Sequence, residues 1–413
     1  MSPPNLKFQK SITDNGIRVV TEQIPYVRSI SLGVWFKVGS RWENTHNNGI
    51  SHFIEHMVFK GTEKRSAKEI AQSMESVGGN LNAFTGKELT CFYAHFLDEY
   101  LPVAIDILAD ITSRPLFNVN DLQKEKQVVI EEIKSLQDTP DELVHEYFQE
   151  NLFYKHPLGL SVLGSIKNIY NLDRNEVLDF WKKNYTSGRV VISAAGNLDH
   201  EKLCRTIEEH FRFNPAILSE IKKEEFKKGG KNNIFRKNVS QAHICIGCKA
   251  LSYKDEKKYS LMVLNVLLGG GMSSRLFQNI REKLGIAYNI YSFIDFYEDS
   301  GVFGAYIGTE PEKVDDSIKL IIKEFSKIKN DRLTDDEVEM AKSQLKGNLM
   351  LGLESTESRM TRLGRMEMYL EEYITLDQVL DGIEKVKKEE IRELAEKLLC
   401  EDNLYTTMII PDN

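Results

Sequence analysis

Cysteine is scarce in this sequence. Only five cysteines occur among 413 residues, and an odd, sparse set does not fit a framework of paired disulfides. This usage is typical of a reducing compartment. Cys245 and Cys248 have the spacing of some metal and redox sites, but they lie in the apolar run 242–248, which predicts a β-strand, and no second such pair exists. We therefore interpret both thiols as packed side chains of that strand.

The sequence also lacks a long apolar run and a positive charge balance. No run approaches the roughly 20 apolar residues of a membrane-spanning helix, and residues 1–7 have no apolar signal-peptide core. The formal net charge is −8, so no net basic field attracts nucleic acid. These absences predict a soluble, cytoplasmic protein that binds neither membranes nor nucleic acids. The acidic balance suits basic peptides as partners, although a solvated acidic surface is the simpler explanation.

What remains is the composition of a globular protein with more than one domain. Hydrophobic residues make up 41% and charged residues 28%, and 413 residues exceed one ordinary core. Runs rich in β-branched residues predict strands at 16–22, 30–38, 189–195, 242–248 and 287–296. Helical periodicity of the apolar residues predicts helices at 50–59, 67–77, 100–113, 121–136, 259–268, 314–328 and 335–351.

The order of these segments recurs after residues 214–233, where Lys, Glu, Gly and Asn indicate a linker. The segment 121–132 resembles 337–348 at an offset of 216 (338 − 122), which aligns Leu122 with Val338 and Glu132 with Asn348. We therefore predict an α+β protein built from two similar halves, residues 1–213 and 234–413, that arose by internal duplication. Of this aligned pair, only Glu132 in the first half is a carboxylate.

The central motif is a predicted helix that contains His52, Glu55 and His56. At about 100° per residue, these three side chains occupy an arc of about 100°, while the apolar residues between them face the core. Two imidazoles one turn apart can bind a single ion, and the neighbouring carboxylate can reach a water on that ion. This is the inverted zinc-helix order, His-x-x-Glu-His. Taken alone, the motif is equally compatible with structural histidines.

A catalytic zinc needs a third protein ligand and leaves its fourth position to water. Glu125 and Glu132 lie two turns apart on one face of the helix 121–136, a face that also carries Leu122, Val128, Val129 and Leu136. Burying two bare carboxylates there would be costly, and a divalent cation removes that cost. Glu131 projects to a solvated face with Lys124, Gln127 and Lys134. Periodicity therefore favours Glu132 over Glu131 as the ligand.

The second half shows no comparable set of residues. The run Gly269-Gly270-Gly271 lacks the spacing and the preceding strand of a phosphate-binding loop, so we predict no nucleotide site. From the residues alone, Gly285 caps the helix that holds Arg281, and Tyr288 opens a strand that runs towards Phe296. Both side chains are then structural.

Several of these segments resemble the pitrilysin/insulinase family of zinc metallopeptidases, in particular its mitochondrial processing peptidase-like branch. The similarity extends over nearly the whole chain. It includes 39–43, the zinc helix 49–57 with its continuation 59–62, the segment 78–85 followed by Glu88, residues 156–159, 184–185 and 196–197, and in the second half 269–277 and 281–288.

The resemblance implies a clamshell of two α/β-sandwich halves, each a mainly antiparallel sheet with helices on one face. It implies one Zn²⁺ per chain, held by His52, His56 and Glu132, with Glu125 as the assisting carboxylate. It also implies that Arg281 and Tyr288 position the substrate. An extended peptide would pair with the edge strand that contains Asn82, Ala83, Phe84 and Thr85. Members of this length act as dimers, either of one chain or with a related partner chain.

The sequence thus predicts a zinc-dependent endopeptidase for unfolded or extended peptides, with Glu55 as the general base for a metal-activated water. Two other functions stay open. The chain could be a non-catalytic partner subunit of a processing-peptidase-like heterodimer, although such subunits typically lose part of the zinc set, which is complete here. It could also be a metal-free peptide-binding or chaperone-like module. The natural substrate is not predicted.

Overall fold

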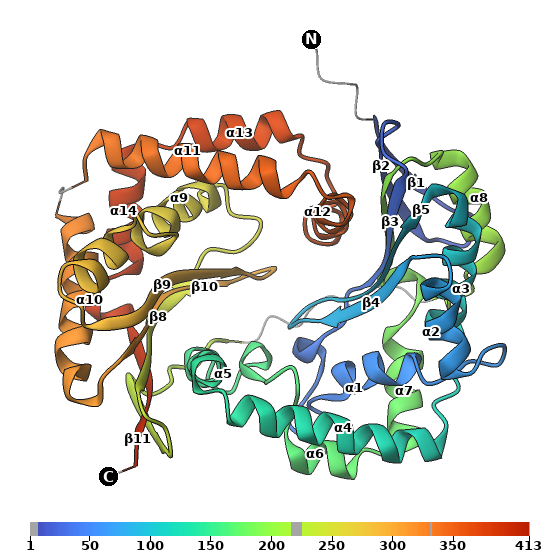
Figure 1. Cartoon of the computed structure of the whole chain (residues 1–413), viewed down its shortest axis with the longest axis horizontal. Coiled ribbons are helices and arrows are strands. Elements are labelled where there is room, and N and C mark those ends of the chain that lie inside the picture. The colour runs from blue at the N-terminus through green and yellow to red at the C-terminus, as the bar shows by residue number, and fades with distance from the viewer. Residues whose placement is uncertain (1–6, 216–224, 331–332, 413) are drawn as a thin grey trace. The chain divides into compact units, whose positions relative to one another are not determined.

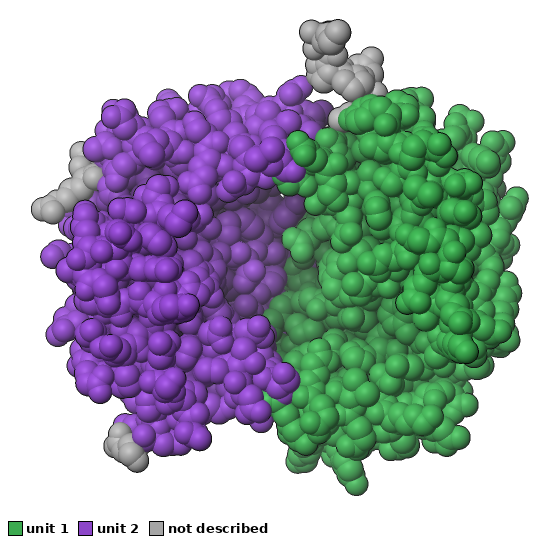
Figure 2. All heavy atoms as spheres, in the orientation of Figure 1, with its two compact units in different colours: residues 1–134, 160–224, 352–373 green, residues 135–159, 225–351, 374–413 purple. Residues whose placement is uncertain are grey.

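Two β-sheets organise the chain (Figure 1). The computed structural model describes residues 7–215, 225–330 and 333–412. The chain divides into two compact units. Unit 1 contains residues 1–134, 160–224 and 352–373, and unit 2 contains residues 135–159, 225–351 and 374–413 (Figure 2). Part of the predicted linker, 216–224, lies outside the described residues.

The sheet of unit 1 has the strand order β1-β2-β6-β3-β5-β4. Its strands are β1 (Lys7–Ile12), β2 (Arg18–Gln23), β3 (Ser29–Phe36), β4 (Asn80–Thr85), β5 (Thr90–Leu97) and β6 (Val190–Gly196). Only the β2–β6 pair is parallel among the described pairings of this sheet. The central strand β3 is buried on both faces, as a sheet covered by helices on both sides requires.

The sheet of unit 2 repeats this pattern. Its order is β7-β11-β8-β10-β9, with the strands β7 (Asn232–Lys237), β8 (Ala242–Ala250), β9 (Ala287–Phe296), β10 (Gly301–Thr309) and β11 (Tyr405–Pro411). The β7–β11 pair is parallel and the other described pairs are antiparallel. This matches β2-β6-β3-β5-β4 strand for strand and direction for direction. The predicted pair of similar α+β halves is confirmed.

Helices cover one face of each sheet with their apolar side chains, and the seven helices that periodicity predicted are among them. In unit 1 the helices are α1 (Ile50–Val58), α2 (Ala67–Glu75), α3 (Leu101–Ser113), α4 (Val119–Gln137, of which residues 135–137 belong to unit 2), α6 (Ile166–Asn171), α7 (Arg174–Asn184) and α8 (His200–His210). In unit 2 they are α9 (Lys258–Gly269), α10 (Val314–Lys329), α11 (Asp335–Gly352), α13 (Leu376–Glu384) and α14 (Lys388–Leu398). Each set forms a separate hydrophobic core with its own sheet.

Two helices each pack on the sheet formed by the other half of the sequence. Helix α5 (Pro140–Leu152) follows α4 in the chain but packs on β8 and β11, and α12 (Thr356–Tyr369) follows α11 but packs on β2, β3 and β6. Each covers the sheet face opposite the other helices: Trp35 lies against Gly364 of α12, and Phe148 of α5 lies against Gly247. The compact units therefore differ from the predicted ranges 1–213 and 234–413 by a reciprocal exchange of one helix.

Helices α4 and α11 preserve the predicted offset of 216, since Val119 corresponds to Asp335 at their first positions. A buried lysine marks the same place in each. Lys126 Nζ donates to the Tyr170 carbonyl at 2.9 Å, and Lys342 Nζ donates to the Glu384 carbonyl at 3.0 Å. Both carbonyls lie at the end of a helix, where backbone acceptors lack intrahelical partners. The structure thus repeats a polar contact as well as the apolar pattern.

The cysteine pair lies on β8, as predicted. All five cysteines are free thiols, and Cys245 and Cys248 are buried. Cys245 packs with α5, whereas Cys248 packs in the core on the other face of the sheet. Because they point to opposite faces, the two thiols do not share a metal ion. None of the helices in the described ranges combines the length and apolar character that a bilayer crossing requires.

Candidate metal centre

The metal site begins with the way α1 starts. Gly49 precedes the helix with φ 99°, a left-handed conformation that disfavours other residues. The buried carboxylate of Glu43 accepts from the backbone N–H of Gly49 at 2.7 Å and of Ser51 at 2.8 Å, and from the Asn48 amide at 2.8 Å. Negative charge at a helix N-terminus is favourable. Glu43 therefore holds the first turn of α1 in place, a role that sequence reasoning missed.

The two faces of α1 are as predicted. Phe53, Ile54, Met57 and Val58 are buried in the core of unit 1. The rings of His52 and His56 lie side by side on the other face, with centroids 4.7 Å apart. A rigid backbone thus presents two imidazoles towards one point.

Helix α4 supplies the carboxylates, although its buried stripe differs from the prediction. Leu122, Val129 and Ile133 are buried, whereas Val128 is 49% exposed and the Glu132 side chain is 43% exposed. The centre of the buried stripe lies about 80° around the helix from Glu125. Glu125 and Glu132 therefore stand at the edge of the stripe, and the assignment of Val128 to the buried face was wrong. Glu131 faces solvent and pairs with Lys134, as predicted.

The edge position brings Glu132 to the histidines. Its Oε2 lies 3.6 Å from His52 Nε2 and 3.5 Å from His56 Nε2. Within the described parts of the chain, these three residues form the one group whose ligand atoms all lie within 4.8 Å of one another. Zinc bonds of about 2.0–2.1 Å in tetrahedral geometry place ligand atoms about 3.4 Å apart. The separations observed here therefore fit a zinc ion.

The protonation of His52 also fits a metal ligand. Burial, helped by the nearby charge of His56, lowers the pKa of His52 to about 3. Its imidazole is therefore neutral at physiological pH and keeps a lone pair for coordination.

Glu55 lies on the same helix, half-buried beside the three ligands. Burial raises its pKa, while hydrogen bonding from Thr85 and the charge of His56 oppose the rise. Its Oε2 is buried and finds no hydrogen-bond partner in the part of the chain that the structure describes. A buried acceptor without a partner is expensive, and a water molecule beside the ligand group would satisfy it.

Glu125 orients His56 from behind. Its Oε2 lies 3.2 Å from His56 Nδ1, and its Oε1 pairs with Lys60 Nζ at 2.8 Å. Burial alone would raise the pKa of Glu125, but the bonds to His56 and Lys60 outweigh it, and the pKa is lowered. A carboxylate on the far nitrogen of a histidine fixes the tautomer that directs Nε2 at a metal. Lys60, which holds this carboxylate, was not predicted.

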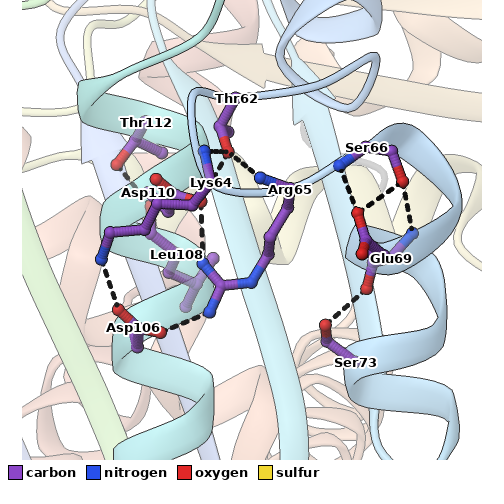
Figure 3. Close-up of polar contacts among 10 residues, drawn as sticks. All are labelled: Thr62, Lys64, Arg65, Ser66, Glu69, Ser73, Asp106, Leu108, Asp110 and Thr112. Atoms are coloured by element: carbon purple, nitrogen blue, oxygen red, sulfur yellow. Dashed lines mark hydrogen bonds and ion pairs between the residues drawn. The ribbon is translucent and has the colours of Figure 1, made fainter.

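The loop after α1 is tied to α3 by a polar cluster (Figure 3). Thr62 donates to Asp110 at 2.6 Å, and Arg65 bonds to Asp110 at 2.8 Å and also to Asp106. The Thr62 hydroxyl in turn accepts from the backbone N–H of Lys64 and of Arg65 at 3.1 Å and 2.9 Å. These bonds hold the segment that carries Lys60 and leads into α2.

Strand β4 contains the predicted peptide-binding residues. It lies at the edge of the sheet of unit 1 and pairs with β5 alone among the described strands. Thr85 at its end reaches the Glu55 carboxylate, so the strand runs past the metal helix. Asn82 and Ala83 lie further along it, with the Ala83 N–H bonded to the Asn82 side chain at 2.8 Å.

Arg281 and Tyr288 belong to unit 2. Arg281 lies in a short π-helical segment, Phe277–Glu282, and Gly285 ends that turn with φ 61°, as predicted. Tyr288 follows the first residue of β9 and is 77% exposed. The Arg281 guanidinium lies 5.9 Å from the Tyr288 ring centroid, so the structure brings the two side chains together. Their position relative to the ligands of unit 1 stays a prediction.

Two imidazoles, a carboxylate from a second helix and an acid within one turn are the components of a zinc hydrolase of the inverted-motif class. Residues 18–165 match the family described as insulinase (peptidase family M16), and residues 171–345 match the peptidase M16 inactive domain. The chain belongs to peptidase family M16.

Similar proteins support a peptidase function and zinc as the metal of this family. The uncharacterized zinc protease YmxG of Bacillus subtilis is 42% identical over 390 residues, which cover 94% of this chain and 95% of the relative. The uncharacterized zinc protease SCO5738 of Streptomyces coelicolor is 38% identical over 399 residues, which cover 95% and 87%.

Two solved structures share the fold. A protease from Helicobacter pylori superposes with a TM-score of 0.92 at 22% identity and covers 98% of this chain and 100% of its own. A peptidase M16 inactive domain from Pseudomonas fluorescens gives 0.91 at 21% identity and covers 99% of both chains.

Proposed function

We propose that this protein is a zinc-dependent endopeptidase that cleaves extended peptides. The observation that carries the proposal is the group of His52, His56 and Glu132, whose facing ligand atoms have the spacing of a tetrahedral zinc site. Beside it lies a Glu55 oxygen without a hydrogen-bond partner among the residues that the structure describes. We propose one zinc ion per chain. When bound, zinc supplies Lewis-acid polarisation of a carbonyl and lowers the pKa of water towards about 7.

The residues of the chain would then divide the remaining chemistry. Glu55 accepts a proton from the attacking water and delivers it to the leaving amine. Its raised pKa places it nearer the operating pH, which favours an acid that must both take and give a proton. Glu125 and Lys60 keep His56 in the ligand orientation. Arg281 and Tyr288 donate to the substrate carbonyl from unit 2 and stabilise its developing charge.

Strand β4 would bind the peptide by adding a strand to the sheet. Its outer backbone groups have no strand partner among the described residues, and main-chain hydrogen bonds give affinity with little demand on sequence. Unfolded or extended segments, presequence-like ones among them, are the substrates that this mode admits. We further propose that the protein acts in the cytoplasm as a dimer, either of this chain or with a related partner.

The decisive experiment compares Glu55→Gln with wild type and with Glu131→Gln, a matched change on the solvated face of α4. Zinc content is measured by elemental analysis, and turnover with an internally quenched peptide. We expect one zinc per chain in all three proteins, turnover by wild type and Glu131→Gln, and a loss of at least about 10²-fold in Glu55→Gln.

Three outcomes would contradict the proposal. Glu55→Gln that cleaves at the wild-type rate would remove its general base. Cleavage that persists after zinc chelation would favour a metal-independent activity. Cleavage that appears only after a related chain is added, and that is equally fast with the Glu55→Gln variant of this chain, would identify a non-catalytic partner subunit. Sizing the purified protein tests the dimer.

A further inference from the structure

Strand β4 presents different surroundings on its two faces. Successive residues of a strand point to opposite sides of the sheet. Thr85 reaches Glu55 on the face that α1 covers. Phe84 lies on the other face, where its ring contacts Trp35 at 5.5 Å between centroids, and Trp35 packs against Gly364 of α12. Asn82 shares the Phe84 face by the period of two. A peptide added to β4 would therefore direct alternate side chains towards α12.

Helix α12 begins close to this edge. The hydroxyl of Thr356 in its first turn lies 2.9 Å from that of Ser31 on β3 and 3.4 Å from His95 Nδ1 on β5. In the sheet register, His95 is paired with Asn80 of β4, and Tyr93 is paired with Asn82. The first turn of α12 thus lies over the strand next to the edge, at the level of Asn80–Asn82.

The residue after Thr356 is Glu357, which is half-buried. Tyr93 has a raised pKa, chiefly from burial and next from the charge and hydrogen bonding of Glu357, so the carboxylate lies beside the partner residue of Asn82. No Lys, Arg or His within the described ranges forms an ion pair with Glu357. The carboxylate therefore has no ion-pair partner within these ranges and is hydrogen-bonded by the neutral Tyr93 hydroxyl, while the charge of Arg365 on the same helix, like its own, reaches Cys91 on β5.

The other acids along α12 and its sheet contrast with Glu357. Glu367 is buried between Lys10 at 2.7 Å and Arg18 at 3.1 Å, and Glu22 pairs with Arg359. These pairs lie on the β1–β2 side of α12 and anchor the helix. On the β4 side, Glu357 has the neutral hydroxyl of Tyr93 as a neighbour and no ion pair among the described residues, so no cation is held at its carboxylate there.

We infer that Glu357 is a specificity-determining residue that selects a basic side chain in the bound peptide. This inference rests on the proposed function, because it requires a peptide on β4. The selected residue would lie near Asn82, three residues and about 10 Å from Thr85, where the strand passes Glu55. A lysine or arginine there would pair with Glu357, whereas a neutral side chain would leave the carboxylate as it is in the free protein.

The test uses matched quenched peptides that carry Lys or Gln at each position within four residues of the cleaved bond. The ratio of kcat/KM for Lys over Gln is measured for wild type, Glu357→Gln, Glu357→Lys and the charge-matched control Glu131→Gln. At one position we expect wild type and Glu131→Gln to prefer Lys by about fivefold, the effect of a partly exposed ion pair. Glu357→Gln should lose this preference and keep its rate on the Gln peptide, and Glu357→Lys should disfavour Lys at that position.

The outcomes separate the two levels of the proposal. A Lys preference that is the same in wild type and in both Glu357 variants, each shown to be folded by its unfolding midpoint and zinc content, overturns this inference and leaves the peptidase proposal intact. Wild-type protein without a Lys preference at any position does the same. Wild-type protein that cleaves none of the peptides overturns the proposed function, and this inference with it.

Discussion

The two repeats of this chain share a scaffold and differ in chemistry. Their sheets have the same strand order and directions, and α4 and α11 carry the buried lysines Lys126 and Lys342 at equivalent positions. At the same offset, however, Glu125 and Glu132 are replaced by Ala341 and Asn348. The comparison teaches that apolar periodicity and a few buried polar contacts maintain the fold. The proposed metal site uses side chains at the edge of the buried stripe, and these differ between the repeats while the core pattern is kept.

Helices α1 and α9, which hold equivalent places in the two repeats, also differ in how they start. Helix α1 starts on a left-handed glycine with a buried carboxylate across its first N–H groups, whereas α9 starts on Lys257 without a side-chain cap. The buried face of both helices is apolar. In α9 the carboxylates of Asp255 and Glu390 contact the Lys257 N–H before the helix and the Ser260 hydroxyl, whereas in α1 one carboxylate spans two backbone N–H groups at the start of the helix that carries the two imidazoles.

The largest effect should come from making the first repeat resemble the second at its ligand position. Glu132→Asn introduces the residue found at position 348, so the fold should tolerate it, while the site loses its anionic ligand. We expect zinc to fall below stoichiometric level and turnover to fall beneath detection. Elemental analysis and peptide cleavage measure both. Glu131→Asn serves as the control, and zinc retained at one per chain in Glu132→Asn would exclude Glu132 as a ligand.

The contribution of the second repeat should be smaller. Tyr288→Phe removes one proposed donor to the substrate carbonyl, and loss of such a donor typically lowers kcat by about 10²-fold. Since Tyr288 is 77% exposed, stability should stay within about 0.5 kcal/mol. Zinc content should be unchanged. A Tyr288→Phe protein with wild-type kcat would show that the tyrosine does not assist catalysis.

The cap of α1 should matter for stability and for metal binding together. Glu43→Ala leaves two backbone N–H groups and the Asn48 amide without their acceptor, at a cost on the order of 3 kcal/mol. We expect a lower urea midpoint and weaker zinc affinity, measured by competition with a chelator. Glu43→Gln, which keeps an acceptor oxygen, should recover part of both. If zinc affinity is unaffected while stability falls, the cap does not position the ligands.

The two exchanged helices should respond differently to acid. Helix α12 is held by ion pairs, whereas α5 places His145 against Tyr291 at 2.9 Å and against the Tyr306 ring. Burial lowers the pKa of His145 to about 4. In the unfolded chain His145 binds a proton near pH 6.5, whereas in the folded chain it stays neutral until the pH is near 4. The contribution of neutral His145 to stability is therefore complete above pH 6.5 and is lost as the pH falls towards 4.

We therefore expect the free energy of unfolding of wild type to fall by about 2 kcal/mol through His145 when the pH is lowered from 7.5 to 5. His145→Gln should lack this part of the loss, as judged by urea unfolding at the two pH values. Identical pH dependence in the two proteins would mean that folding does not shift the pKa of His145.

Much of the fold and site followed from the sequence because local patterns reflect local packing. Helix α1 and strand β9 begin where periodicity placed them, and Glu131 faces solvent as expected. Val128 was misplaced because its angle on α4 is close to that of Glu125, and the sequence does not say where the centre of the buried stripe falls. Glu43 and Lys60 were missed because a cap or an ion pair with a distant segment leaves no periodic signal. Helices α5 and α12 were not predicted, and an amphipathic pattern there would have predicted a helix but not which sheet it covers.

The exchange of α5 and α12 has consequences for expressing the two halves separately and for the origin of the repeat. A gene divided at residues 214–233 would encode two pieces, each of which contains the helix that belongs on the other's sheet. Each piece alone would expose one apolar face of its sheet and the apolar side of one unpacked helix. We therefore expect the fragments to be insoluble when expressed separately and soluble when expressed together. If an ancestral single-repeat protein folded in the same way, its helix would have packed on the sheet of a second copy. Gene duplication would then have joined the two copies in one continuous chain.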